Sequence, residues 1–348
     1  MIRDVARRGL FGLDRLLGGG GRGLILLYHR VADEPSDPYG LCVSPVQFRE
    51  HLELLRELGR PMPVCDMARA VEDGALPNRA IGVTFDDAYI DVLETAVPLL
   101  MEYEIPATVF VTVGPAGRGR EFWWDELERI FLQSERLPEA LEIEIDGENR
   151  RWNLGDGPDI HPPPPSPAEA TGRPWHLDDE DAPTLRHAAF RDVYHLLRPL
   201  PTPARTALMD RLLAWSGDRA DVVRPTHRAM TPEEVAGMTR PGLIHAGAHT
   251  VSHPDLTSQT EEVCREEVRR SRSDLADWIG SEVQGFAYPY GLHDPASASA
   301  VRDAGFAFAC TGDYRSVRNR DEALLLPRID VPAGSGRFPI DLVRRFLG

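Results

Sequence analysis

Residues 81–89 read Ile81-Gly82-Val83-Thr84-Phe85-Asp86-Asp87-Ala88-Tyr89, an apolar run that ends in two adjacent carboxylates. The apolar side chains at alternate positions predict a short buried strand, and the helical spacing of apolar residues after Tyr89 predicts a helix through Met101. Two like charges at such a junction need a metal ion or a basic group beside them. The alternative is that one aspartate only caps the helix.

A pair of histidines four residues apart, His249 and His253, lies near the other end of the chain. We expect such a pair to share one face of a helical turn and to chelate one ion. Two imidazoles and one carboxylate leave a coordination position for water, which is typical of a catalytic site rather than a structural one. Alone the spacing is a weak signal, since it also occurs on polar helix faces. His245, in the preceding predicted strand, is interpreted as structural.

Two further predicted strands end in polar residues. One is Phe286-Ala287-Tyr288-Pro289-Tyr290-Gly291, and the other is Leu325-Leu326-Pro327-Arg328-Ile329-Asp330-Val331. A strand that stops at Pro-X-Gly holds backbone N–H groups in a fixed direction, where they can stabilise an oxyanion. The alternative is a simple turn.

Three of these stretches, in this order, resemble the motifs of the polysaccharide deacetylase family, also called the NodB homology domain. They are Thr-Phe-Asp-Asp at 84–87, His-Thr-Val-Ser-His at 249–253 and Phe-Ala-Tyr-Pro-Tyr-Gly at 286–291. The segments 24–31 and 325–331 resemble the first and last strands of one branch of this carbohydrate esterase family. The resemblance covers about residues 22–115 and 230–332.

The resemblance implies a distorted (β/α)7 barrel, and the alternation of predicted strands and helices agrees with a parallel α/β barrel. An open doubly wound sheet is disfavoured, because the glycines at 18–21 precede the first strand. We expect an amphipathic helix and glycine-rich link at 1–21 and the barrel at 22–348, with a mostly helical, Pro-rich insertion at 115–230 as a cap. Within the insertion the pattern predicts a helix from Glu121, a hairpin at Asp146-Gly147, a polyproline loop at 161–167, and helices at 182–197 and 203–215.

The family's site residues can be carried over where this sequence matches its motifs. Asp87, His249 and His253 would then hold a divalent metal, for which Zn²⁺ is the first candidate and Co²⁺, Ni²⁺, Mn²⁺ and Fe²⁺ are alternatives. Asp86 would be the general base that takes a proton from metal-activated water, and the backbone N–H of Tyr290 would stabilise the oxyanion. The implied reaction is metal-dependent hydrolysis of an N-acetyl amide.

The sequence departs from the family in two places. Ala287 stands where many members carry an arginine that orients the base, and no histidine follows His293 to supply the usual late Leu-x-x-His acid. Arg328, at the end of the last predicted strand, is our candidate to pair with Asp86 instead. His29, at the end of the first strand, is our candidate acid, with metal-bound water or a merely structural His29 as alternatives.

Three functions remain open at this point. The first is removal of an N-acetyl group from an acetamido sugar, in a glycan, on a lipid carrier or in a small glycoside. The second is amide hydrolysis of a non-sugar substrate at the same site. The third is a catalytically silent module that binds a glycan. The tryptophans Trp123 and Trp124 either stack on sugar rings or fill the core.

Composition limits the partners. The net charge of −16 over 348 residues argues against nucleic acid or an anionic membrane surface as the main partner. The N-terminal segment lacks the apolar core of a secretory signal, and no apolar run is long enough to cross a membrane. We therefore expect a cytoplasmic protein, with peripheral membrane contact through the N-terminal helix as an option. The four widely spaced cysteines are expected to be reduced and buried. The substrate, acyl group, metal and oligomeric state stay open.

Overall fold

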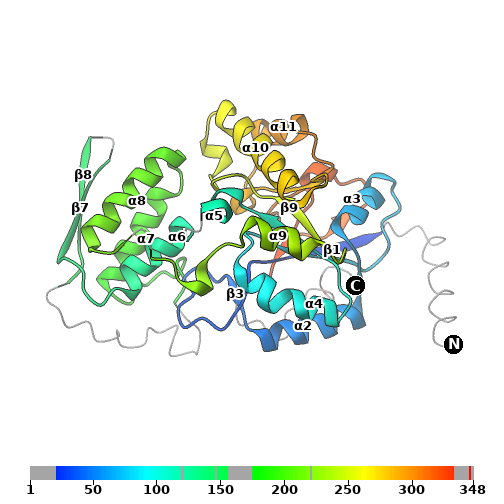
Figure 1. The fold of residues 1–348 in the computed structure, drawn as a ribbon, viewed down its shortest axis with the longest axis horizontal. Helices are drawn as coiled ribbons and strands as arrows, with labels where there is room; N and C mark the ends of the chain where they lie inside the picture. Colours follow the sequence, from blue (N-terminus) through cyan, green and yellow to red (C-terminus); the bar gives the residue numbers. More distant parts are fainter. Residues whose placement is uncertain are drawn as a thin grey trace.

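A curled parallel sheet forms the centre of the molecule (Figure 1). The computed structural model describes residues 21–118, 121–145, 147–155, 175–219, 222–332 and residue 345. In this part of the chain the hydrogen-bonded order is β11-β10-β9-β6-β5-β1, and β13 pairs with β1 on the far side. These strands are β1 (Arg22–Tyr28), β5 (Ala80–Phe85), β6 (Ala107–Val111), β9 (Ile244–Ala248), β10 (Gly285–Ala287), β11 (Phe308–Cys310) and β13 (Ile329–Asp330). The predicted distorted (β/α)7 barrel is confirmed.

The segment from Leu326 to Val331 closes the barrel. On one side the amide of Leu326 donates to the carbonyl of Ala309 at 2.8 Å. On the other side the amide of Val331 donates to Leu27 at 3.0 Å, and Ile329 pairs with Leu26. The predicted strand at 325–331 is wrong in length, since only Ile329–Asp330 is strand. Ala323–Leu325 form a 3-10 turn (η7), and Pro327 has no N–H for a ladder.

Alternate residues of β1 pack in different hydrophobic clusters, as the period of two in a strand requires. Leu24 and Leu26 belong to the larger cluster, which includes side chains of most of the surrounding helices. Ile25 belongs to a smaller cluster that includes Phe110 of β6, Cys310 of β11 and the buried side chains of the helix α3 (Val64–Glu72). Because these strands are not neighbours in the sheet, the smaller cluster fills the inside of the barrel and continues onto α3.

Helices surround the barrel. They are α2 (Pro45–Leu58), α3 (Val64–Glu72), α4 (Val97–Glu102), α5 (Val113–Arg118), α9 (Pro232–Thr239), α10 (Glu261–Ile279) and α11 (Pro295–Asp303). At the start of α2 the Ser44 side chain accepts from the amide of Gln47 at 3.2 Å and so caps the helix. A π-helical turn, η1 (Val92–Ala96), precedes α4. The remaining short strands are β2 (Arg30–Val31), β3 (Cys42–Val43), β4 (Arg60–Pro61) and β12 (Val317–Arg318).

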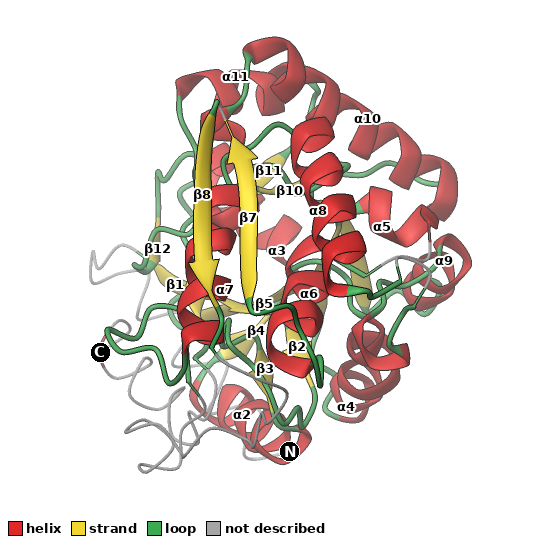
Figure 2. Ribbon diagram, turned by 90° about the vertical axis from the view of Figure 1, so that its left-hand side faces the viewer, coloured by secondary structure: helices red, strands yellow, loops and turns green. Residues whose placement is uncertain are grey.

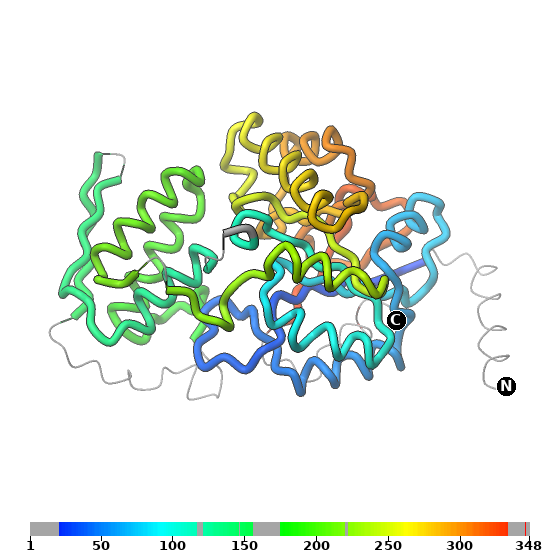
Figure 3. The backbone as a smooth tube through the Cα atoms, in the orientation of Figure 1, coloured from blue at the N-terminus to red at the C-terminus, as the bar shows by residue number. Residues whose placement is uncertain are grey.

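A second group of elements lies beside the barrel and is called here the α6–α8 lobe (Figures 1 and 3). It contains α6 (Trp123–Glu128), the π-helical η2 (Arg129–Gln133), β7 (Ala140–Ile145), β8 (Glu148–Asn153), α7 (Leu185–Leu197) and α8 (Thr202–Ser216). The predicted hairpin is confirmed as the antiparallel pair β7–β8, which lies at the outer edge of the lobe in Figure 1 and faces the viewer in Figure 2. The two predicted helices correspond to α7 and α8. The domain bounds and the capping role of this region stay predictions.

Two predicted segments lie outside the described residues. These are the amphipathic helix and glycine-rich link at 1–21, of which only Gly21 is described, and the polyproline loop at 161–167. No helix in the described part of the chain has the length and apolar character of a membrane span. All four cysteines are free thiols. The expectation that all are buried is wrong for Cys65, which is only partly buried on α3.

Candidate active site

The carboxyl ends of the barrel strands bring the predicted residues together. Asp86 and Asp87 follow β5, and His249 follows β9 directly. Tyr290 lies in the 3-10 turn η6 (Pro289–Gly291) after β10, and Arg328 precedes β13 on the closing segment. Parallel strands all end at the same rim, so residues more than 240 positions apart in sequence meet there.

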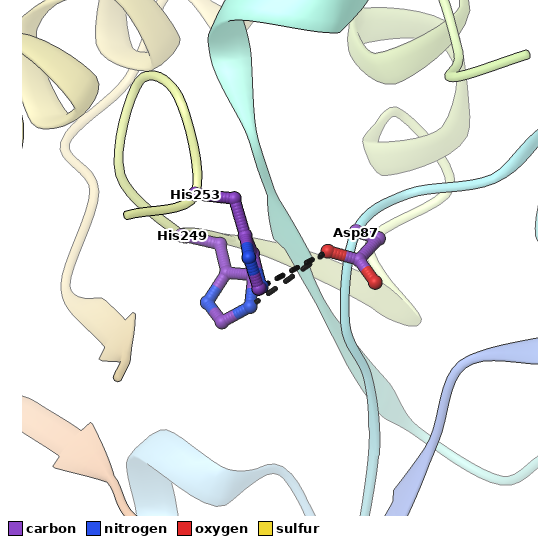
Figure 4. Close-up of side chains that lie close together, drawn as sticks. All are labelled: Asp87, His249 and His253. Carbon is purple, nitrogen blue, oxygen red and sulfur yellow. Dashed lines mark ion pairs between the residues drawn. The ribbon is translucent and has the colours of Figure 1, made fainter. Parts of the chain in front are cut away.

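Asp87, His249 and His253 form a compact group of three ligand atoms (Figure 4). These atoms lie within 4.8 Å of one another. Asp87 Oδ1 is 3.8 Å from His249 Nε2 and 3.6 Å from His253 Nε2. All three side chains are buried. Asp87 Oδ1 has no hydrogen-bond partner in the described structure, although a buried carboxylate oxygen normally has one.

The two histidines do not share a helical turn, so that prediction is wrong. Residues 249–255 form a loop between β9 and the 3-10 turn η5 (Leu256–Ser258). Thr250 and His253 have left-handed backbones, with φ of 66° and 52°. The hydroxyl of Thr250 accepts from the amide of His253 at 3.0 Å and so closes the loop. This turn, rather than helical periodicity, directs both imidazoles to one point.

The backbone of Asp87 is also in the left-handed region, with φ of 71°, and Ala88 follows with φ of 61°. The segment that leads from the α6–α8 lobe back to the barrel supports this bend. The amide of Met230 donates to the carbonyl of Ala88 at 2.9 Å, and the amide of Ile90 donates to Arg228 at 3.0 Å. The bend turns Asp87 away from the line of β5 and toward the histidines.

A backbone carbonyl orients His249. Its Nδ1 lies 2.8 Å from the carbonyl oxygen of Ala287, which can only accept, so Nδ1 carries the proton. The lone pair is then on Nε2, the atom that faces Asp87. A ligating histidine in proteins almost always has such a partner on its other nitrogen. Ala287 therefore contributes its main chain at the position where many family members have an arginine.

Aromatic rings hold His253 on two sides. The Trp124 ring lies 4.7 Å from the imidazole centroid and the Tyr290 ring 4.6 Å, both in edge-to-face geometry. Trp124 Nε1 donates to the Tyr89 hydroxyl at 2.7 Å, which fixes the indole. Of the two tryptophans, Trp124 lines the site cavity, whereas Trp123 stacks on Tyr194 in the lobe.

Arg328 and Asp86 form a bidentate ion pair. Nη1 donates to Oδ1 at 2.7 Å and Nη2 donates to Oδ2 at 2.8 Å, and Arg328 is 1% exposed. His249 Nε2 lies 3.7 Å from Asp86 Oδ2, which is as close as its 3.8 Å distance to Asp87 Oδ1. Distance therefore does not distinguish the two aspartates as ligands. Their hydrogen bonds distinguish them, because both Asp86 oxygens accept from Arg328 while Asp87 Oδ1 has no partner.

The pKa values of the two aspartates move in opposite directions. Burial alone would raise the pKa of Asp86, but the charge of Arg328, together with its hydrogen bonds to the carboxylate, outweighs burial and lowers this pKa. Burial raises the pKa of Asp87 well above its usual value, and the charges of Asp86 and Asp125 add to the shift. Burial also lowers the pKa of His249 and, more strongly, that of His253.

These residues fit a divalent metal ion. An unpartnered carboxylate oxygen faces two imidazole nitrogens in a buried pocket, and the mixed N/O donor set suits zinc and its neighbours. A cation at this point would supply the positive charge that Asp87 lacks. Three protein ligands leave room for a water or substrate oxygen.

The group lies at the base of a cavity of about 330 Å³ between the barrel rim and α7. Its lining includes His29, Asp330, Tyr39, Tyr194 and Arg198. A larger cavity, of about 660 Å³, is lined by the first residues of three strands, Ile244, Gly285 and Phe308, and so lies at the opposite end of the barrel. His245 lines that second cavity and does not line the site cavity, and its interpretation as a structural residue stays a prediction.

Sequence reasoning missed several residues of the cavity. Tyr194 and Arg198 come from α7 and its C-cap, and Tyr39 comes from the loop after β2. No motif marks them, and only the packing of the lobe on the barrel brings them to the site. Asp330, in contrast, lies two residues after Arg328 in the predicted strand at 325–331, so the sequence offered a signal that could have identified it as a site residue.

A family model described as polysaccharide deacetylase matches residues 73–134 and 180–309, more than half of the chain. In sequence, the poly-beta-1,6-N-acetyl-D-glucosamine N-deacetylase of Escherichia coli (strain K12) is 34% identical over 112 residues. That alignment covers 30% of this chain and 16% of the Escherichia coli enzyme. The similarity therefore concerns a small part of that longer protein.

Two solved structures share the fold. The Streptococcus pyogenes deacetylase PplD, in complex with acetate, superposes with a TM-score of 0.57 at 16% identity, covering 94% of this chain and 98% of PplD. IcaB from Ammonifex degensii superposes with a TM-score of 0.52 at 20% identity, covering 91% of this chain and 94% of IcaB. At these identities the two structures establish the fold alone.

Proposed function

Because this chain belongs to the polysaccharide deacetylase family, we propose that it is a metal-dependent N-deacetylase that releases acetate from an acetamido sugar. One observation carries the proposal: the unpartnered Oδ1 of Asp87 faces Nε2 of His249 and of His253, beside an Asp86 whose oxygens are held by Arg328. Metal ligands and a separate base are the two parts that water-driven amide hydrolysis needs.

Asp87, His249 and His253 would hold the ion. When bound, a divalent ion supplies Lewis acidity, which lowers the pKa of a water and polarises a carbonyl oxygen. Asp86 would take the proton from the attacking water. The ion pair with Arg328 orients the Asp86 carboxylate but lowers its basicity. Asp86 could therefore take a proton only from a water whose pKa is already lowered.

Water adds to the amide carbon, and the C–N bond breaks once the nitrogen has received a proton. We assign that proton to His29, which lines the cavity together with Asp330. Asp330 belongs to β13 and pairs with Leu27 of β1, so it lies on the strand next to the one that His29 follows. The Tyr290 backbone N–H remains our candidate oxyanion donor.

The proposed substrate is an N-acetylglucosamine unit. The Escherichia coli relative is a deacetylase of poly-beta-1,6-N-acetyl-D-glucosamine, and the cavity combines aromatic rings with polar side chains, as sugar sites do. Whether this unit belongs to a polymer, a lipid-linked glycan or a small glycoside is decided by the substrate panel below. The cytoplasmic location and a peripheral membrane contact stay predictions.

The test is acetate release by the purified protein from N-acetylglucosamine oligomers, a lipid-linked N-acetylglucosamine, nucleotide sugars and a non-sugar acetanilide. Each substrate is assayed as purified, after chelation, and after chelation with zinc or cobalt restored. We expect release from a sugar substrate that chelation abolishes and metal restores. His29→Gln is the variant for the acid, and we expect it to lower turnover without loss of bound metal.

Three results would contradict parts of the proposal. Acetate release that survives complete chelation excludes metal dependence. Release from acetanilide but from no sugar favours the general amide hydrolase. Stoichiometric metal or glycan binding with no hydrolysis of any substrate favours the silent binding module.

A further inference from the structure

The loop that carries the histidines is held in a costly backbone conformation. Thr250 and His253 both have positive φ, and Thr250 is β-branched, which makes this conformation especially unfavourable. Residues held in this way cost on the order of 1–3 kcal/mol each and persist only where surrounding contacts enforce them. Contacts that enforce this loop therefore also determine where His253 points.

One set of these contacts comes from the barrel. Glu267 of α10 accepts from the amide of Val251 at 2.8 Å, from the amide of Ser252 at 2.9 Å and from the hydroxyl of Ser252 at 2.6 Å. This carboxylate holds the middle of the loop. It does not reach the carbonyl groups at the end of the loop.

A second set comes from the α6–α8 lobe. Arg205 of α8 donates from Nη2 to the carbonyl of Ser252 at 2.7 Å and from Nη1 to the carbonyl of His253 at 3.5 Å. Thr202, three residues earlier, shares a 2.7 Å hydrogen bond with the Ser252 hydroxyl. Arg205 is 3% exposed, and its guanidinium lies over the Trp123 ring at 5.3 Å. The lobe thus holds the loop by hydrogen bonds at His253, the proposed metal ligand, and at the residue before it.

We propose that Arg205 is a positioning residue for His253, and that the α6–α8 lobe is thereby part of the scaffold of the metal centre. The inference rests on the proposed function only in that it takes His253 as a metal ligand. Without Arg205 the carbonyls of Ser252 and His253 lose their buried donors. The loop can then relax toward negative φ, which moves the imidazole away from Asp87.

Cobalt titration of the metal-free protein, followed by visible absorption, tests this directly. We expect Arg205→Met to weaken Co²⁺ binding by about 10- to 100-fold, the range typical of outer-shell changes at metal sites. Arg205→Lys should recover part of the affinity, since an ammonium group can still donate to one carbonyl. Activity is not needed for this readout.

Arg186→Met is the matched control. Arg186 is also a buried arginine of the lobe, 8% exposed, and its Nη1 donates to the carbonyl of Ser134 at 2.8 Å, away from the histidine loop. We expect this variant to lose stability in urea unfolding while its Co²⁺ affinity stays at the wild-type value. If Arg205→Met does not fold, Arg205→Lys and Thr202→Val carry the test, and each should weaken Co²⁺ binding relative to Arg186→Met.

Two outcomes would overturn the inference. The first is wild-type Co²⁺ affinity in the folded Arg205 and Thr202 variants. The second is an equal loss in Arg186→Met, which would mean that general loosening of the lobe is the cause. If the wild-type protein bound no Co²⁺, the metal centre of the proposed function would fail as well, so the wild-type titration separates the two cases.

Discussion

Arg328 and Asp86, 242 residues apart in sequence, form a bidentate ion pair at the centre of the barrel rim, with N–O distances of 2.7 and 2.8 Å. Arg328 Nε also donates to the carbonyl of Thr311 at 3.1 Å, which ties the pair to the strand beside the closing segment. The pair therefore links the first half of the barrel to its last strand.

Removing only the arginine of this ion pair should destabilise the protein. Arg328→Met leaves a buried carboxylate without its cation, and we expect a loss of about 3–5 kcal/mol in the free energy of unfolding. The double variant Asp86→Asn/Arg328→Met should lose less than the sum of the single variants, because neither charge is left alone. Urea unfolding of the four proteins measures this coupling. Additive losses would show that the pair contributes nothing beyond its separate parts.

Substitutions of the two adjacent aspartates should have different effects on metal binding and on turnover. Asp87→Ala, His249→Ala and His253→Ala are each expected to abolish stoichiometric metal binding, because three ligands become two. Asp86→Asn should retain metal and lose about 10²- to 10⁴-fold in kcat, the usual contribution of a general base. Metal content by elemental analysis and acetate release together check both statements. Full activity in Asp86→Asn would show that another group is the base.

The stability of the protein should fall in acid because of His227. Burial, with the charges of Arg30 and Arg224, lowers the pKa of His227 to about 2. Its neighbour Glu34, whose carboxylate is 4.0 Å away, is itself paired with Arg30 at 2.9 Å. Below pH 6.5 the unfolded chain binds a proton at His227 that the folded protein excludes, so stability is lost as the pH falls.

For His227 we expect a loss of about 2 kcal/mol in the free energy of unfolding between pH 7.5 and pH 5. His227→Gln, which cannot be protonated, should lack this component. Urea unfolding of both proteins at the two pH values gives the difference. An identical pH dependence in wild type and variant would exclude His227 as the cause.

Thiol reactivity should distinguish the cysteines. Cys42, Cys264 and Cys310 are buried, whereas Cys65 is partly exposed on α3. Burial and the nearby Asp66 raise the pKa of Cys65, so we expect this thiol to react slowly. Ellman's reagent should label one cysteine in the native protein and four after denaturation, and Cys65→Ser should remove the native reaction. Rapid labelling of a second thiol in the native state would contradict the packing described here.

The chemistry of the site was largely visible in the sequence, because it depends on residue types at strand ends. Asp86-Asp87 after an apolar run and His249 after another predict that these side chains meet, since parallel strands end at one rim. The pairing of Arg328 with Asp86 was anticipated from the same rule. The functional roles of these residues are tested only by the experiments above.

The conformation of the histidine loop was not predictable. The spacing of His249 and His253 suggested a helical turn, and local propensity disfavours left-handed conformation at Thr250. Contacts from remote segments, such as Glu267 and Arg205, outweigh that local preference. The length of the last strand was not predictable either. Its apolar residues suggested a continuous strand at 325–331, but a 3-10 turn and Pro327 shorten it to Ile329–Asp330.

The sequence by itself determined the family, the barrel and the set of candidate ligands, because apolar periodicity and the residues after each strand are local properties of the chain. Only the tertiary structure decided which aspartate has a free oxygen, how the loop turns His253 toward Asp87, and that Arg205 of the lobe grips that loop. Those features depend on hydrogen bonds between segments distant in sequence, whose energies no local pattern records.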